Sequence, residues 1–441
     1  MPGDTLQVEA YMGSTKAHNG YFDLYKGLYQ VSSLDWNHGR LKYDNNFKTF
    51  TKGLDYNHIA LSDINIGIDS LYYLSPKLNL KMRACSFKEK SGIEVNEFTG
   101  PISLDSTKVF LPALRFRTPD SELSADFEMD LNAFAKNRPG KIYLRMDGLF
   151  GKQDLMRFMG GMPQVFVRRW PNYPLIVRGS VTGNMNYVDF TGLFIKLPTA
   201  FDILANGYIA NPMDMKHIDT QVRLNAHTYN LGFVTALLDK KIMNQYRIQS
   251  GIGVSGNFSM KGKHYAANLT ARESRGVVHA KGTFNAAAMS YQAALRISNL
   301  QIHHFMPHDS LYVFTGNVDV KGHGTDVMSK RTQINAKANI SKFQYGHWNL
   351  DKMKANVVVS NGKAHADIDS NNPLLKGLIS LDALLNTKKV QATISADLGK
   401  ADLYRLRLMS SPFTTSLCAH VDIASDMNNY YKVEGMVSDM T

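Results

Sequence analysis

The sequence predicts an all-β fold: an elongated, curled and mostly antiparallel repeat sheet that forms a groove, with short capping helices. Three observations lead to this prediction. Apolar and polar residues alternate along most of the chain, turn signals separate the alternating segments, and one helix-then-strand pattern occurs four times. Alternation with a period of two gives a strand one apolar and one wet face, which favours antiparallel over parallel pairing.

The alternation is clearest at Ile64, Ile66 and Ile68, which are separated by Asn65 and Gly67. The same pattern returns at 78–84, 222–227 and 390–396. Turn-forming residues lie between such segments, at 183–184, 360–362 and 369–373. We therefore expect short strands joined by tight turns along the whole chain.

The repeated pattern consists of a short apolar segment, predicted to be helical, followed by an alternating strand that carries glycine or other small residues. Self-similarity at long spacing is typical of repeat architectures, in which each unit buries its apolar face against its neighbours. The helical segments are too short to form a second layer, so we expect them to cover edges of the sheet. The predicted helical segments are 154–159, 231–238, 300–305 and 402–408, and the strands that follow them are 175–183, 246–256, 312–322 and 417–423.

The domain organisation follows from these repeats, because no linker rich in Pro, Gly or Ser divides the chain. We expect an N-terminal β-rich segment over 1–150 and a repeated region over 151–441. The irregular spacing of the repeats favours an open sheet over a closed propeller, whose blades are nearly equal. The expected repeat units cover approximately 151–230, 231–297, 298–400 and 401–441.

The composition restricts the function classes. The 441 residues include 50 basic and 38 acidic ones, a formal net charge of +12. This charge suits a polyanion or an anionic membrane surface, but the basic residues are spread along the chain, which is typical of a solvated face. We expect no nucleic-acid partner. Cys85 and Cys418 lie far apart and indicate neither a disulfide framework nor a zinc site.

Targeting signals are also missing from the sequence. No apolar run reaches the roughly 18 residues of a membrane span, and the first residues carry no signal-peptide pattern. Both ends read as arbitrary cuts, so we expect this chain to be part of a longer one.

Candidate chemistry is sparse. His303, His304 and His308 cluster near Met306, but no carboxylate or cysteine completes a metal shell there. The glycine-rich segments 160–163 and 322–326 are interpreted as turns, because neither opens a long helix after a parallel strand. No nucleophile elbow is present. We expect no enzyme, no catalytic residue, no metal and no cofactor.

The apolar stripe of the repeated strands carries more information. It mixes medium-sized aliphatic residues with Gly, Ala and Ser at recurring positions. Two interpretations remain open: the stripe is an ordinary sandwich or barrel core, or it lines a curved sheet that leaves room for acyl chains. The candidate groove residues are Val177, Val181, Ile252, Val254, Val318, Val320, Val421 and Ile423.

A family resemblance bears on this choice. The resemblance rests on the order of several features along the chain. The first part of the chain contributes the segments 56–66, 69–73, 83–93, 111–119 and 130–134. The second part contributes the short helices that open with Asp-Leu at 154 and 402, the glycine-flanked strands, the 322–327 segment and the turn at 361–364. In this order they resemble the AsmA-like, TamB (translocation and assembly module) family of diderm bacterial envelopes.

The resemblance implies a curled sheet with an apolar interior, located in the periplasm and anchored to the inner membrane through a segment absent from this chain. It implies phospholipid or another acyl lipid as cargo, carried between inner and outer membrane. Alternatively, it implies a factor for the translocation and assembly of outer-membrane proteins that works with a barrel partner. The family has no catalytic motif to transfer to this chain.

Two other classes of protein make different predictions. A carbohydrate-active β-helix enzyme predicts rungs of about 20–25 residues with charged residues stacked in register, which this sequence lacks. An outer-membrane barrel predicts roughly ten-residue strands with aromatic girdles, whereas the aromatic residues here do not cluster at strand ends.

Overall fold

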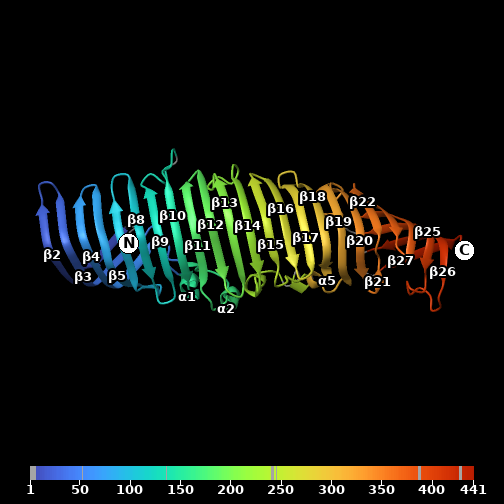
Figure 1. Cartoon of the computed structure of the whole chain (residues 1–441), viewed down its shortest axis with the longest axis horizontal. Helices are drawn as coiled ribbons and strands as arrows, with labels where there is room; N and C mark the ends of the chain where they lie inside the picture. The colour runs from blue at the N-terminus through green and yellow to red at the C-terminus, as the bar shows by residue number, and fades with distance from the viewer. Residues whose placement is uncertain are drawn as a thin grey trace. The chain divides into compact units, whose positions relative to one another are not determined.

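The computed structural model (Figure 1) describes residues 6–51, 53–135, 137–239, 243–244, 246–385, 389–426 and 430–441. It confirms the predicted all-β fold with antiparallel pairing: strands account for most of the described residues, and the helices are one or two turns long. The chain divides into two compact units, Met1–Leu238 and Asp239–Thr441. Each unit is described by itself.

In unit 1 the strands follow one another as an antiparallel meander. The edge is shared by β1 and β2, which pair with different halves of β3; Tyr11 lies opposite Arg40 and Ser14 opposite Asn37. Its elements are β1 (Leu6–Tyr11), β2 (Ser14–Asp23), β3 (Leu28–Asn45), β4 (His58–Leu74), β5 (Lys77–Glu89), β6 (Glu94–Val95), β7 (Glu97–Leu104), β8 (Lys108–Arg117), β9 (Glu122–Asp130), β10 (Ile142–Phe150), α1 (Lys152–Phe158), α2 (Gln164–Arg169), β11 (Leu175–Asn184), β12 (Tyr187–Leu197), β13 (Phe201–Ala210), β14 (Asp219–Thr228) and α3 (Gly232–Thr235).

Unit 2 repeats this meander. The short strand β21 pairs only with the end of β20, and β22 continues the ladder on the remainder of β20. Its elements are β15 (Gly253–Lys261), β16 (His264–Glu273), β17 (Gly276–Asn285), β18 (Ser290–Gln301), α5 (Ile302–Phe305), β19 (Leu311–His323), β20 (Gln333–Tyr345), β21 (Trp348–Asn349), β22 (Met353–Ser360), β23 (Lys363–Asn371), β24 (Leu375–Leu385), β25 (Val390–Asp402), β26 (Thr414–Ser425) and β27 (Tyr431–Ser438).

Glycine has two distinct tasks in these sheets. At the β22–β23 hairpin, Asn361 and Gly362 both have positive φ, of 51° and 70°, as a tight two-residue turn between right-twisted strands requires. Within strand β15, Gly256 has φ +141°, and a Cβ there would lie 2.1 Å from the carbonyl oxygen of Asn268 on β16. A side chain at this position would therefore force the two strands apart.

Most predicted elements are present. Helices form at α1, α3 and α5, and the repeated strands 175–183, 312–322 and 417–423 lie within β11, β19 and β26. The predicted helix at 402–408 is a series of turns, although the amide of Leu406 still donates to the carbonyl of Asp402. Residue 150, near which the sequence suggested a boundary, ends β10, and β10 pairs with strands on both sides.

The strand predicted at 246–256 is wrong in its first half, because β15 begins only at Gly253. The residues before it run past α5. The amide of Arg247 donates to the carbonyl of Phe305, and the side-chain amide of Gln249 donates to the carbonyl of His304. The residues before Gly253 therefore form hydrogen bonds with the α5 turn instead of the strand-to-strand hydrogen bonds that their alternating sequence predicts.

The helices of unit 1 cover one rim of its sheet. Phe166 and Trp170, four residues apart at α2, face inward together and pack around Phe233 of α3, with ring centroids 5.5 Å and 5.0 Å away. Leu197 and Ala200, at the turn between β12 and β13, complete this fully buried cluster. Of the predicted helical segments, α3 packs on this rim as a short cover rather than as a second layer, whereas α2 was not predicted from the sequence.

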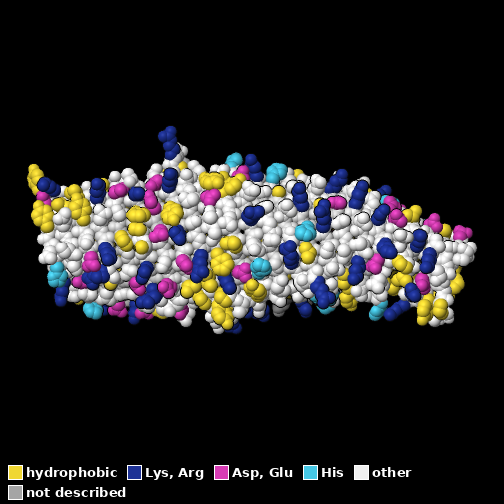
Figure 2. Space-filling view, in the orientation of Figure 1, with side chains coloured by type: hydrophobic (Ala, Val, Ile, Leu, Met, Phe, Trp, Pro, Cys, Tyr) yellow, Lys and Arg dark blue, Asp and Glu magenta, His cyan; other side chains and the backbone are white. Residues whose placement is uncertain are grey.

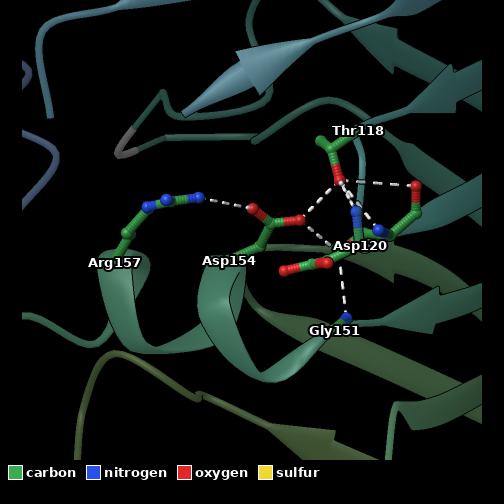
Figure 3. Close-up of polar contacts among 6 residues, drawn as sticks. Thr118, Asp120, Gly151, Asp154 and Arg157 are labelled. Carbon is green, nitrogen blue, oxygen red and sulfur yellow. Dashed lines mark hydrogen bonds and ion pairs between the residues drawn. The ribbon is translucent and has the colours of Figure 1, made fainter. Parts of the chain in front are cut away.

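A buried carboxylate fastens α1 to the β8–β9 turn (Figure 3). Asp154 is 3% exposed, and its Oδ2 accepts hydrogen bonds from the hydroxyls of Thr118 at 2.5 Å and Ser121 at 2.6 Å. Its Oδ1 receives a bond from Arg157 Nη1 at 3.3 Å, and the amide of Gly151 donates to Ser121 Oγ at 3.0 Å. A charged group out of contact with water requires such a set of donors.

A second buried polar group orders the loop before β4. Asp55 accepts bonds from the backbone amides of Thr51 at 2.8 Å and Asn57 at 3.0 Å, and it contacts the His58 ring nitrogen at 3.0 Å. The Thr51 amide, together with the Asn57 amide and His58, holds the pKa of Asp55 at about 2, although burial opposes this by raising it. The ring of Phe50 stacks on His58 with centroids 3.8 Å apart.

We predict that Asp154→Ala lowers the free energy of unfolding by about 2–3 kcal/mol, because it leaves the Thr118 and Ser121 hydroxyls and the Arg157 guanidinium without their acceptor. Denaturant unfolding followed by circular dichroism measures this change. The matched control is Asp147→Asn, which removes an exposed carboxylate paired with Arg178 at 2.8 Å and should cost at most about 1 kcal/mol. Equal losses in both variants would contradict a special role for the buried cluster.

Candidate functional site

The strand register of unit 2 gathers apolar side chains on one side of its sheet, here called the apolar face. Residues directly opposite each other in antiparallel strands point to the same side. From Val318 on β19, the cross-strand positions are Leu295, Ala280, Leu269 and Gly256 towards β15, and Ala338, Ala355, Ile368, Ile379, Ala396, Ala419 and Val437 towards β27. Every position in this row is apolar.

The neighbouring row, two residues further along each strand, is equally free of polar side chains. It contains the candidates Val320 and Val421. From Val320 the positions are Ala293, Gly282, Ala267 and Phe258 towards β15, and Ala336, Val357, Ala366, Leu381, Ile394, Val421 and Gly435 towards β27. Two adjacent apolar rows thus cross the unit without interruption.

The remaining candidates of unit 2 lie on the flanks of these rows. Val254 pairs with Ala271, and Ile423 pairs with Ala392, both on the apolar face. Ile252 is placed just before β15, two residues from Val254. The register therefore brings Val254, Val318, Val320, Val421 and Ile423 onto one continuous face.

The opposite face of the same strands is polar. Asp319 lies between Val318 and Val320 and pairs with Ala294 and Lys337. Figure 2 shows charged side chains spread over the surface turned to the viewer, without a single-sign cluster. The dispersed charge of the sequence is therefore the solvated side of the sheets.

The apolar face is half-buried rather than buried. Val254, Val318, Val320, Val421 and Ile423 all retain intermediate exposure. A sandwich core would bury such side chains almost completely, because facing layers pack at the density of organic crystals. These positions are therefore less buried than those of an ordinary closed core.

One buried cluster of unit 2 lies at a rim. Leu398 and Leu417 are buried together with Ala401, and Leu403 from the turns after β25 packs against them. This arrangement parallels the α2–α3 cluster of unit 1. In both units, short non-strand segments pack on a rim of the sheet, and in unit 2 the candidate residues of the central rows keep intermediate exposure.

The two candidates of unit 1 also lie on an apolar face. Val177 on β11 lies between Gly148 and Ile195, and Val181 lies between Leu144 and Phe190. Both are half-buried. They belong to unit 1 and are assigned to the face of that unit alone.

One row of aromatic residues was not predicted from the sequence. Tyr265, Phe284 and Tyr291 occupy consecutive positions across β16, β17 and β18 of the apolar face. The rings lie near enough to interact. The centroids of Tyr265 and Phe284 are 6.1 Å apart, and the ring of Phe258 on β15 lies 6.4 Å from Tyr265. Only the register shows the row, because the three residues are far apart in sequence.

Two hollows of unit 2 are lined mainly by residues of the polar face. One, of about 510 Å³, is lined by Asp367, Leu378, Cys418 and Met436 among others. A second, of about 410 Å³, includes Asp319, Lys337 and Asp369. Both hollows also touch members of the Val318 row, such as Ile368 and Ala338, but most of their lining residues lie on the polar face.

The histidines singled out in the sequence do not build a metal centre. His304 Nδ1 contacts Glu273 Oε1 at 2.7 Å, and the His303 ring lies against Tyr312, with centroids 5.2 Å apart. Among the residues that the structure describes, no group of three or more His, Cys, Asp or Glu side chains is arranged to hold a metal ion.

No helix within the described parts of the chain has the length and apolar character to cross a membrane. Comparison of the chain with protein-family models, with curated proteins and with solved structures finds no match.

On the polar face, the pKa of His365 is shifted by two neighbouring carboxylates. His365 Nδ1 lies 2.7 Å from Asp382 Oδ1, and its Nε2 lies 3.1 Å from Asp367 Oδ2. Hydrogen bonding to Asp382, and then to Asp367, raises the pKa of His365 above its ordinary value. The stabilisation it contributes is complete below the pKa of the unfolded chain and is lost as pH rises through the folded pKa.

We predict that NMR titration places the pKa of His365 above 6.5 and that Asp382→Asn lowers it towards that value, because the closer carboxylate is removed. Asp369→Asn changes the same charge on the same strand as His365 and serves as the control; it should leave the titration almost unchanged. A pKa that responds equally to both variants would contradict the pairing seen at β23 and β24.

Proposed function

We propose that the apolar faces bind the acyl chains of lipids and that the protein carries lipid between the inner and outer membranes of a bacterial envelope. The observation that supports this most is the pair of uninterrupted apolar rows through Val318 and Val320, in which most residues keep intermediate exposure. A surface of this kind favours a long apolar ligand over a compact polar one.

The energetics favour a lipid as occupant. Each methylene group transferred from water to an apolar surface gains about 0.8 kcal/mol, so an acyl chain gains binding energy along its whole length. A charge in its path would cost several kcal/mol unless paired. The two rows contain no charged or polar side chain, and a chain lying on them encounters no such obstacle.

The cellular setting comes from the family resemblance. It favours the periplasm, an inner-membrane anchor outside this chain and an outer-membrane barrel as a partner. The same resemblance offers a second role, in which the sheet assists the translocation and assembly of outer-membrane proteins. The two roles differ in whether a lipid must move along the apolar face.

We predict that a photo-crosslinking amino acid at Val254 or Val318 captures lipid in cells, because both side chains lie on the apolar face. The controls are their sequence neighbours Ser255 and Asp319, which point to the polar side. Mass spectrometry of the crosslinked protein identifies the adduct. Equal capture on both sides, or no capture at Val254 and Val318, would remove the support for a lipid-binding face.

We predict that Val320→Arg abolishes lipid transfer while the protein accumulates normally, because the guanidinium interrupts the apolar rows at a position that is already open to solvent. Transfer between donor and acceptor vesicles, and integrity of the outer membrane in cells, measure the effect. The matched control is Asn317→Arg, which adds the same charge on the polar face of β19. An assembly factor would tolerate both variants, and normal transfer by Val320→Arg would reject the conduit.

A further inference from the structure

The rim of unit 1 carries an exposed patch that the folding of the unit does not require. We define this rim patch as Phe158, Val165, Arg168, Arg169, Val234 and Leu237. Figure 2 shows hydrophobic side chains gathered along the rim where Figure 1 places α1 and α2. Because the buried cluster of Phe166, Trp170 and Phe233 already anchors the helices, these exposed residues are available for a partner.

The apolar members of the rim patch project from the outer sides of the helices. In α2, Phe166 faces the core while Val165 next to it is 41% exposed. In α3, Phe233 is buried and Val234 is 39% exposed, and Leu237 in the turn after α3 is 46% exposed. Phe158, at the end of α1, is 51% exposed. All three segments pack on one cluster, so these side chains lie around a common rim.

The charge of the rim patch is positive only. Arg168 and Arg169 are exposed in the last turn of α2, and neither has an ion-pair partner among the described residues. The only acid between residues 152 and 173 is Asp154, which is buried and bonded to Arg157. Residues 229–238 contain no charge at all.

We propose that the rim patch docks on the surface of an anionic lipid bilayer. Exposed aliphatic and aromatic side chains beside unpaired arginines are the features by which interfacial segments insert among headgroups and attract acidic lipids. A protein partner would normally be met with charges of both signs, which fix its register. A bilayer offers no fixed geometry and needs only apolar side chains and positive charge. The inference is independent of whether the apolar faces carry lipid.

The test is co-flotation of the full chain with vesicles of phosphatidylcholine, with and without phosphatidylglycerol. The wild type should float with the anionic vesicles and remain free with the neutral ones. Arg168→Gln/Arg169→Gln should weaken binding by about thirtyfold, since each of the two basic residues near such a surface contributes about 1 kcal/mol. Val165→Ser/Leu237→Ser should weaken it as well, without any change of charge.

Matched controls distinguish docking of the rim patch from the non-specific attraction between a protein of net charge +12 and an anionic vesicle. Arg145→Gln/Arg223→Gln removes two exposed arginines from the polar face of β10 and β14, and Leu204→Ser removes an aliphatic side chain that is 43% exposed on β13. Both controls should bind like the wild type, and circular dichroism confirms that each variant is folded.

Losses as large in the controls as in the rim variants would overturn the proposal in favour of non-specific attraction. Absence of flotation with either vesicle would overturn it in favour of a protein interface. Lipids co-purifying with the rim variants should match those of the wild type, because the central apolar rows are unchanged. A rim variant that loses flotation but keeps its lipid separates this inference from the proposed function.

Discussion

Strand register is the constraint on which the rest of the structure depends. Side chains alternate with a period of two, so a slip of one residue between any two strands would place polar residues such as Asp319 and Lys337 in the row of Val318. In unit 2 the register keeps this row apolar from β15 to β27, through strand pairs that contain bulges, as at Ile297–Leu300 of β18. Each bulge shifts the pairing without mixing the two faces in the central rows, because it lies outside them.

The rims solve a problem that this register creates. Where the strands of such a sheet end, its apolar side would be exposed to water unless other residues cover it. In unit 1 the α2–α3 cluster seals the turns between β12 and β13, and in unit 2 Leu403 covers Leu398 and Leu417. Asp154 adds directional hydrogen bonds from Thr118 and Ser121 to the apolar packing of α1 on the α2–α3 cluster. The short helical and turn segments therefore pack on the ends of the strands and do not form a layer over the sheet.

The sequence was sufficient for what depends on local pattern. Alternation and turn chemistry predicted strands such as β11, β19 and β26, and the candidates Val254, Val318 and Val320 share a face because alternation and repeat position agree. Contacts between distant segments could not be predicted. The start of β15 depends on Phe305, the burial of Asp154 depends on Thr118 and Ser121, and the aromatic row through Tyr265 depends on the register of three strands. None of these leaves a signal within a short window of sequence.

The residues chosen for the central rows reconcile an open face with a folded sheet. Large aliphatic side chains without a cover would leave much apolar area in water, at about 25 cal/mol per Å². Alanine and glycine occupy many of these positions, including Ala338, Ala366 and Gly282, and they expose little area when the face is empty. Larger residues such as Val318 and Leu295 stand between these small ones. A face built in this way costs little when it is empty, and this is the property that the proposed binding of a long, thin and apolar ligand requires.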